Sequence, residues 1–556
     1  MDSPPPIKTF MGLKGRPLSL MVSTIATTGF LLFGYDQGVM SGLISAKPFL
    51  AYFPEATDQT YAGFVTAIYE VGCLFGAIFA LAYGDKLGRR KLIIAGAVIM
   101  ILGVVIQVTS WQYYKPMVQF IIGRTITGIG NGLNTSSIPT YQAECSRTSN
   151  RGLLICIEGG IIAFGTLIAY WIDYGASWAP ADLADFTWRF PIAFQIVFGL
   201  IVGFGMIFLP ESPRWLLSQD RHEEGLAVIS ALHGQPTTDP DVMLQKTLIL
   251  DSIAASGTSG KTPYKSLFTG GKTQHFRRML LGASSQFMQQ IGGCNAVIYY
   301  FPILFQSSIK TSHSLALLLG GINMIVYAIF ATTSWFIIER VGRRQLFLWG
   351  TAGQCLSMVL TFACLIPGTT SSAKGSAVGL FTYIAFFGAT WLPLPWLYPA
   401  EINPLRTRAR ANAVSTISNW LFNFVIVMVT PVMISGIGWG TYLFFAVVNA
   451  CFVPVIYFFY PETKRRSLEE IDLIFAKGYL ENISYVRAAK EMPFLNDHEV
   501  DQMARQYGFV DQDDEYRMGE KDDDEKPSVG RTYSDASRNS NHREHSHARH
   551  EGFRND

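Results

Sequence analysis

Charge is scarce in this chain. Asp, Glu, Lys and Arg make up only 15% of its 556 residues, against 49% hydrophobic residues, and the formal net charge is +2. The mean hydropathy is +0.24, although the residues after about 480 are strongly polar. Such an average requires long apolar runs elsewhere. It leaves no strongly basic surface, so we expect no nucleic-acid partner.

Residues for metal, disulfide and catalytic chemistry are also few. The seven cysteines are scattered without the spacing of a metal site, and none is placed to pair across an oxidising loop. No nucleophile–base arrangement, metal motif or nucleotide loop is present. The sequence therefore predicts no disulfide, metal, cofactor or enzyme activity. Residues 1–16 lack a signal-peptide pattern, so we expect the first span to act as its own insertion signal.

Long apolar runs dominate instead. Twelve stretches approach the roughly 20 residues with which a helix crosses a bilayer. They are 18–44, 61–84, 92–110, 116–139, 152–174, 190–209, 279–305, 314–338, 346–366, 376–399, 410–434 and 439–460. The sequence therefore predicts a multi-pass α-helical protein of the lipid bilayer.

Basic residues are concentrated in alternate connections between these stretches. They occur in GDKLGRRK (84–91), ERVGRR (339–344), RTRAR (406–410) and KRR (464–466), whereas the opposite connections hold single lysines such as Lys47. Since basic connections stay in the cytosol, we expect both termini and the loop 210–278 to be cytosolic. We expect the plasma membrane as the location.

The two halves of the chain repeat each other. LGRR (87–90) recurs as VGRR (341–344), and PESPR (210–214) recurs as PETKR (461–465). The copies lie roughly 250 residues apart, which is typical of a duplicated bundle. The predicted parts are a cytosolic N-terminus (1–17), a six-helix bundle (18–209), a cytosolic linker with short helices (210–278), a second six-helix bundle (279–460) and a cytosolic tail (461–556). After about 480 the tail is too polar to fold, so we predict disorder and possible sites for regulatory partners.

These motifs belong to a longer ordered series. The series is GYDQGVMSG, GDKLGRRK, GRTITGIGNG, YQAECSR, PESPRWL, QQIGGCNAVIYY, ERVGRR, PWLYPAEINPLRTRARA and PETK. With it the chain resembles the sugar porters of the major facilitator superfamily, most closely the fungal sugar and polyol:proton symporters. The resemblance implies an all-α membrane protein with the major facilitator fold, in which twelve transmembrane helices form two pseudo-symmetric six-helix bundles joined by a cytosolic helical linker. Such carriers open a site between the bundles to each side alternately.

One carboxylate, Asp36, lies inside the first apolar stretch, where charge is costly. Counting about 1.5 Å per helical residue places Asp36 and Arg124 at the same outer depth. Burial favours the protonated acid and a nearby arginine favours the ionised acid, so we predict that Asp36 exchanges a proton as it releases and rebinds Arg124. The resemblance assigns the same coupling role to both. The alternative is a permanent structural ion pair.

Two further acids, Glu70 and Glu158, lie within predicted spans. Either can capture a proton or pair with a polar helix neighbour. We include Glu158 among the candidates for proton coupling.

Charged residues also gather where predicted helices end at the cytosolic face. Pairs formed across spans and across the halves would latch this face shut, and the resemblance assigns them this role. Exposed pairs contribute only about 0–1 kcal/mol each, so the latch would depend on their number. The alternative is that these residues only fix the topology. The gate candidates are Asp85, Arg89, Arg90, Glu144, Arg151, Glu211, Arg214, Glu339, Arg343, Arg344, Glu401, Arg408 and Glu462.

Amide and tryptophan side chains suit a neutral sugar, which has hydroxyl groups and an apolar ring face. In QQIGGCN, helical phase turns some of the amides toward one shared face. The prolines of TWLPLPWLYP interrupt a predicted span, which is tolerated chiefly beside protein or a water-filled cavity. The alternative is that these amides only join helices. The candidates for substrate binding are Gln289, Gln290, Asn295, Asn323, Trp391, Trp396, Asn419 and Asn423.

One position departs from the family pattern. Many sugar porters carry a substrate-binding glutamine in the fifth span, where this chain has Gly159. This change resembles the branch of fungal glycerol:proton symporters. We expect a secondary active transporter that imports a neutral hexose or pentose with protons, driven by the proton gradient. The alternatives are a glycerol or polyol:proton symporter, a passive sugar facilitator and, more distantly, a transporter-like nutrient sensor.

Overall fold

The computed structural model describes residues 7–111, 115–146, 151–257, 267–308, 311–404 and 407–508. The chain divides into two compact units, Met1–Val500 and Asp501–Asp556. The first unit contains all the long helices. The predicted disorder beyond residue 508 falls outside the described residues.

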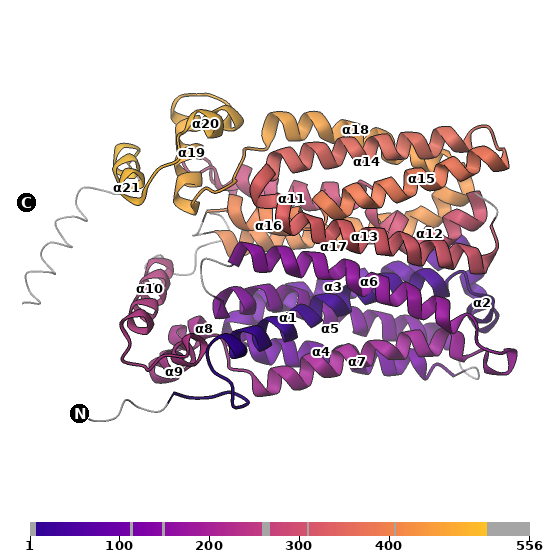
Figure 1. The fold of residues 1–556 in the computed structure, drawn as a ribbon, viewed down its shortest axis with the longest axis horizontal. Coiled ribbons are helices and arrows are strands. Elements are labelled where there is room, and N and C mark those ends of the chain that lie inside the picture. The colour runs from indigo at the N-terminus through magenta and orange to yellow at the C-terminus, as the bar shows by residue number, and fades with distance from the viewer. Residues whose placement is uncertain are drawn as a thin grey trace, which may run out of the picture. The chain divides into compact units, whose positions relative to one another are not determined.

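The long helices form two bundles that lie side by side (Figure 1). The N-terminal bundle consists of α1 (Arg16–Leu43), α3 (Gln59–Leu87), α4 (Arg89–Val108), α5 (Pro116–Cys145), α6 (Arg151–Ala176) and α7 (Phe186–Phe208). The C-terminal bundle consists of α11 (His275–Ile291), α12 (Cys294–Ser308), α13 (His313–Val341), α14 (Arg343–Leu365), α15 (Thr370–Phe386), α16 (Leu394–Ile402), α17 (Arg408–Ile437) and α18 (Gly440–Phe459). The duplication seen in the motifs is therefore a duplication of helical bundles.

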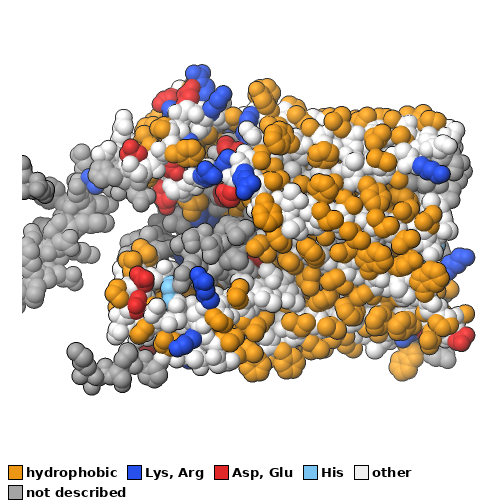
Figure 2. All heavy atoms as spheres, in the orientation of Figure 1, with side chains coloured by type: hydrophobic (Ala, Val, Ile, Leu, Met, Phe, Trp, Pro, Cys, Tyr) orange, Lys and Arg blue, Asp and Glu red, His pale blue; other side chains and the backbone are white. Residues whose placement is uncertain are grey.

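Within the described residues, nine helical segments are long and apolar enough to cross a membrane. The predicted spans 116–139, 152–174 and 279–305 are helical as well but lie outside these nine. Large apolar side chains cover the flank of the bundles in Figure 2. Phe204 and Leu356, for example, are 61% and 68% exposed, as expected where lipid replaces water.

Short helices lie at one end of the bundles (Figure 1). They are α8 (Pro213–Ser218), α9 (His222–His233), α10 (Pro240–Gly257), α19 (Leu468–Leu480) and α20 (Tyr485–Glu491), and α2 (Lys47–Tyr52) lies at the opposite end. The backbone N–H of Gly15 donates to the carbonyl of Ala231 at 2.7 Å. The start of α1 and the linker therefore lie at the same end, which we call the linker end, opposite the α2 end.

Part of the segment that was predicted to be disordered after about residue 480 is helical. After α19 the chain forms α20 and α21 (Asp497–Gln506). Tyr485 of α20 stacks on Phe475 of α19, with ring centroids 4.8 Å apart. The side chain of Ser484 accepts a hydrogen bond from the N–H of Arg487 and caps α20. Local capping and one aromatic contact thus order a segment whose composition is polar.

Matching glycines start α4 and α14. Gly88 and Gly342 have φ of 89° and 107°, in the region that favours glycine. The carboxylate of Glu211 accepts hydrogen bonds from the backbone N–H groups of Arg89 and Arg90, each at 3.1 Å. Glu462 occupies the same position at the start of α14. A carboxylate at a helix N-terminus satisfies unpaired N–H groups and complements the helix dipole.

We expect Gly88→Ala to lower the melting temperature of the purified protein. A Cβ atom at this position would lie 2.6 Å from Glu211 Oε2, and the backbone there, with φ 89° and ψ 156°, is in a region that essentially only glycine adopts and that costs another residue about 1–3 kcal/mol. Gly436→Ala is the matched control, because a Cβ atom there meets nothing within 4 Å. A melting temperature that falls equally in both variants would contradict this reasoning.

Candidate functional site

The predicted span 279–305 is two helices. α11 ends at Ile291, and α12 begins at Cys294 after a glycine pair. The carbonyl freed at Gly292 accepts hydrogen bonds from the Tyr383 hydroxyl at 2.8 Å and from Asn449 Nδ2 at 3.0 Å. This break is tolerated because side chains of neighbouring helices satisfy the backbone.

The predicted break at the prolines of the tenth span is also present. α15 passes through a π-helical turn, Phe387–Trp391, before α16 begins. Pro395 and Pro399 lack the N–H groups that would bond the carbonyls four residues earlier, those of Trp391 and Pro395. Gln289 Nε2 donates to the Trp391 carbonyl at 2.7 Å, and Gln286 Nε2 donates to the Pro395 carbonyl at 2.6 Å. Two glutamines of α11 therefore replace two missing helix hydrogen bonds.

The other amides form a cluster beside this break. Asn295 Nδ2 donates to Gln290 Oε1 and to Asn423 Oδ1, both at 2.6 Å. Asn419 Nδ2 donates to Gln286 Oε1 at 2.5 Å. The cluster joins α11, α12 and α17, and all of these side chains are buried.

A small cavity opens beside the cluster and between the bundles. Phe33, Gln37 and Ile162 line it from the N-terminal bundle, and Gln289, Gln290, Cys294, Asn295, Ile298, Tyr327, Phe387, Leu392, Trp396 and Asn419 line it from the C-terminal bundle. Its volume is about 20 Å³, which accommodates about one water molecule. A sugar can occupy this site only after the surrounding helices separate.

Five of the eight predicted substrate-binding residues line the cavity, and three do not. Trp391 donates from Nε1 to the Thr351 hydroxyl at 3.0 Å and packs on Phe347, so its ring faces α14. Asn423 bonds Asn295 but does not itself line the cavity. Asn323 is buried on α13 and does not line the cavity either. Two residues that sequence reasoning missed are Gln37, next to Asp36, and Gln286, one helical turn before Gln289 and Gln290.

Asp36 and Arg124 meet as predicted. Arg124 Nη1 lies 3.6 Å from Asp36 Oδ1, and both side chains are fully buried. The guanidinium also lies over the ring of Tyr69, 4.7 Å from its centroid. At 3.6 Å the ion pair is longer than a charge-assisted hydrogen bond of about 2.7–2.9 Å. The two side chains therefore form a buried ion pair without a hydrogen bond between them.

Glu158 does not join this pair. Its side chain is buried on α6, and Oε1 has no hydrogen-bond partner among the described residues. The following glycines lie against the other bundle, since a Cβ atom at Gly160 would lie 2.4 Å from Trp335 Nε1. The assignment of Glu158 to proton coupling stays a prediction.

Charge clusters of matching design lie at the linker end of the two bundles. The ion pairs are Arg89–Asp85 (3.0 Å), Arg89–Glu144 (3.2 Å), Arg343–Glu339 (2.6 Å) and Arg343–Glu401 (2.7 Å). The hydroxyl groups of Ser212 and Thr463 donate to Glu144 and Glu401 in turn. The duplication therefore extends to individual hydrogen bonds.

Four other gate candidates lie outside these ion pairs. Three of them donate hydrogen bonds to backbone carbonyls. Arg90 and Arg344 donate to the carbonyls of Met206 and Tyr457, at 2.8 and 2.7 Å, and Arg408 donates to that of Asn403 at 3.2 Å. Arg214 forms no ion pair with any residue that the structure describes. The side chain of Arg151 lies outside the described residues.

The predicted pairing across the halves is not seen among ion pairs whose two partners are both described. Each cluster stays within its own bundle. The reason is local geometry: Asp85 and Arg89, like Glu339 and Arg343, stand four residues apart along the chain and meet as neighbours on one face. The printed geometry of the described residues thus joins helices within each bundle, and the latch between the bundles stays a prediction.

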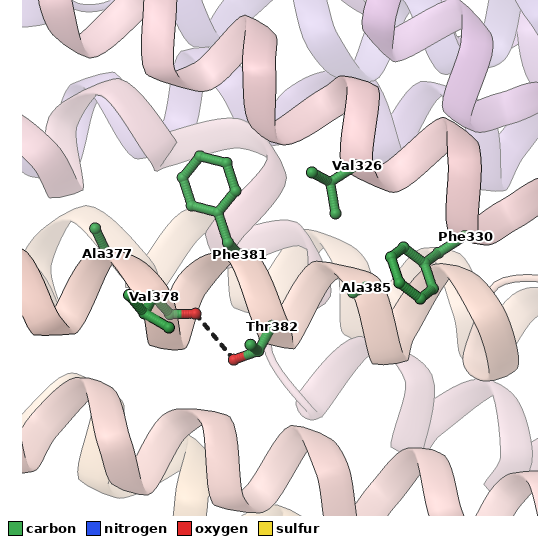
Figure 3. A pocket seen from close by; sticks show the side chains of 7 residues that line it. All are labelled: Val326, Phe330, Ala377, Val378, Phe381, Thr382 and Ala385. Atoms are coloured by element: carbon green, nitrogen blue, oxygen red, sulfur yellow. Dashed lines mark hydrogen bonds between the residues drawn. The ribbon is translucent and has the colours of Figure 1, made fainter.

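A second cavity is an apolar groove between α13 and α15 (Figure 3). Its volume is about 440 Å³, and its lining is Val326, Phe330, Ala377, Val378, Phe381, Thr382 and Ala385. The Thr382 hydroxyl donates to the Val378 carbonyl at 2.9 Å, within its own helix. The groove contains none of the candidate residues and offers little to a polar solute.

Residues 21–475 match the family described as "Sugar (and other) transporter", and the chain belongs to this family. "Sugar transporter STL1" of Saccharomyces cerevisiae is 45% identical over 531 residues, covering 94% of this chain and 92% of that protein. "Major facilitator superfamily transporter mfsA" of Aspergillus fumigatus is 45% identical over 528 residues, covering 92% and 96%. The sequence-based recognition of the sugar porters is confirmed.

Solved structures agree on the fold. The proton:xylose symporter XylE bound to 6-bromo-6-deoxy-D-glucose superposes with a TM-score of 0.71 at 25% identity, over 83% of this chain and 99% of that chain. A partially occluded inward-open form of XylE from E. coli gives 0.69 at 23% identity, over 81% and 100%. The protein is thus a multi-pass sugar transporter with the major facilitator fold, and its relatives are transporters rather than enzymes.

We expect Asn295→Ala to raise the KM for transported sugar about tenfold, equivalent to about 1.4 kcal/mol. The substitution removes a cavity amide, leaves Gln290 Oε1 with only the Cys294 thiol as donor at 3.7 Å, and leaves Asn423 Oδ1 without its donor. Asn323→Ala is the matched control, because Asn323 does not line the cavity. Uptake of labelled glucose and xylose measures both, and a larger effect at Asn323 would contradict the assignment.

We expect Gln286→Met to destabilise the folded protein by about 1–3 kcal/mol, because the Pro395 carbonyl loses its donor in a buried site. Gln354→Met is the control, since Gln354 Nε2 has no hydrogen-bond partner among the described residues. Thermal unfolding in detergent compares the two. Equal stability of both variants would show that the carbonyl of Pro395 needs no side-chain donor.

Proposed function

We propose that the protein imports a neutral hexose or pentose together with protons by alternating access. The observation that carries this proposal is the buried, loosely held ion pair between Asp36 and Arg124. Asp36 shares α1 with Phe33 and Gln37, which line the cavity. One helix therefore carries both the acid and part of the solute site.

Protonation of Asp36 would remove the attraction that holds Arg124. The neutral acid tolerates burial, while the released guanidinium keeps its contact with the ring of Tyr69. α1 is then free to move relative to α5, and Phe33 and Gln37 move with it. A proton and a sugar thus bias the same two-state equilibrium.

The lining of the cavity supports a neutral solute. It contains amides and aromatic rings but no Asp, Glu, Lys or Arg. Amides donate to and accept from hydroxyl groups, and Trp396 offers an apolar face. The solved relative XylE is described as a proton:xylose symporter, which favours the same class of solute.

The proposed orientation places the linker end and both termini in the cytosol and the α2 end outside, in the plasma membrane. The excess of basic residues at the linker end favours this orientation.

A glycerol or polyol:proton symporter is the second candidate. Gly159 leaves α6 without an amide where it approaches Pro393, since a Cβ atom there would lie 3.3 Å from Pro393 Cα. A wall with fewer hydrogen-bonding groups suits a smaller polyol. A panel of glucose, xylose, arabinose, galactose and glycerol in carrier-deficient cells separates the two candidates.

We expect Asp36→Asn to abolish sugar-driven proton uptake while exchange of sugar across the membrane continues. The amide cannot gain or lose a proton, so only coupling is lost. Alkalinisation of the medium measures coupling, and labelled sugar measures exchange. Asp182→Asn, the same change at an exposed acid, is the control. Wild-type accumulation that survives a protonophore would identify a passive facilitator and overturn the proposal.

A further inference from the structure

Glu70 forms a direct hydrogen bond between the two bundles. Its side chain lies fully buried on α3. The hydroxyl of Tyr299, on α12 of the other bundle, donates to Glu70 Oε1 at 2.7 Å. A neighbouring contact at the α2 end is equally close, because a Cβ atom at Gly63 would lie 2.5 Å from the Met428 carbonyl oxygen. Glu70 and Tyr299 thus form part of the contact between the two bundles near the α2 end. We call this contact, which closes the α2 end, the seam.

Glu70 has no cation of its own. Arg124 acts on both Asp36 and Glu70 electrostatically, but its only ion pair among the described residues is with Asp36. Glu70 Oε2 has no hydrogen-bond partner among the described residues. Two buried carboxyl groups therefore face one guanidinium. An ionised carboxylate without a partner is strongly disfavoured away from water, so the closed seam accommodates Glu70 as the neutral acid.

The other titratable groups near Glu70 do not supply the missing positive charge. They are Tyr69 and Cys73 of α3, and Cys294, Tyr299 and Tyr300 of α12. From α17 the neighbour is Asn423, a neutral amide. None of these groups can compensate a carboxylate as a cation would.

Asn423 connects Glu70 to the solute site. Its Oδ1 accepts from Asn295 Nδ2 at 2.6 Å, and the same Nδ2 donates to Gln290 at 2.6 Å. The amide that faces Glu70 is thus one hydrogen bond from a residue lining the cavity. A single side chain, Asn423, therefore lies between Glu70 and a residue that lines the cavity.

We propose that Glu70 is a second proton-binding acid and that, with Tyr299, it forms an outer gate that closes only on the protonated carboxyl group. This inference rests on the proposed symport and orientation. When the α2 end opens, α12 moves away and water reaches Glu70, which ionises. Closure expels that water, so the carboxylate first takes a proton from external hydronium and leaves a water molecule behind. The Tyr299 hydroxyl then donates to the neutral acid.

Glu70→Gln tests the proton-binding role, since the amide keeps an acceptor for Tyr299 but cannot ionise. Full-length protein in proteoliposomes with an internal pH dye and labelled sugar reports protons and sugar together. We expect the ratio of protons to sugar to keep its wild-type value, with exchange retained, because the proton that Glu70 takes on closure returns to the outside when the α2 end reopens. We also expect the external KM, which in the wild type rises with external pH, to rise less steeply in this variant, since only the contribution of Asp36 remains.

Tyr299→Phe and Tyr300→Phe form a matched pair for the gate. The Tyr300 hydroxyl donates to the Val427 carbonyl at 2.6 Å and to no acid. We expect Tyr299→Phe to raise the external KM at least several-fold with coupling retained, and Tyr300→Phe to change neither quantity.

Three outcomes are decisive. A Glu70→Gln protein whose external KM has the wild-type pH dependence would overturn the proton-binding role. If that variant does not fold, an unchanged KM in Tyr299→Phe overturns the gate. A wild-type protein that takes up no protons with sugar would overturn the symport itself, which is a separate failure.

Discussion

The cost of an unsatisfied polar group inside a lipid-embedded bundle governs the centre of this transporter. Prolines of the tenth span free two backbone carbonyls, and Gln286 and Gln289 donate to them. A glycine pair breaks the seventh span, and the freed carbonyl of Gly292 is bonded from two other helices. The irregular backbone and the buried amides therefore occur together, because each broken helix requires donors, and one of these donors, Gln289, also lines the cavity.

This arrangement gives the buried amides two roles. Gln289 holds a helix together with its Nε2 group while its other face lines the cavity. Asn295 and Gln290 bond other side chains, so under the proposed function they would exchange those partners for sugar hydroxyl groups at smaller cost. Helix packing and solute binding are therefore not assigned to separate regions. Neighbouring amides, and even different atoms of one amide, serve one or the other.

Duplication explains the stability of each bundle but not how the two are joined. Arg89 and Arg343 organise equivalent clusters, each within its own half. The halves meet instead through close glycine contacts, aromatic edges such as Phe33 on Trp420 at 5.3 Å, and the bond from Tyr299 to Glu70. Weak contacts suit an interface that must open and close, since two states must differ by only a few kcal/mol.

The sequence by itself determined the membrane-spanning character, the duplication, the family and the meeting of Asp36 with Arg124, because hydropathy, repeated motifs and helical rise are properties of the chain alone. Only the tertiary structure decided that Trp391 turns toward α14, that Gln286 joins the amide cluster, and that α20 and α21 follow α19. The direction of a side chain depends on how its helix is rotated against its neighbours, and a polar segment folds when a partner surface is present. Neither condition can be read from composition or spacing.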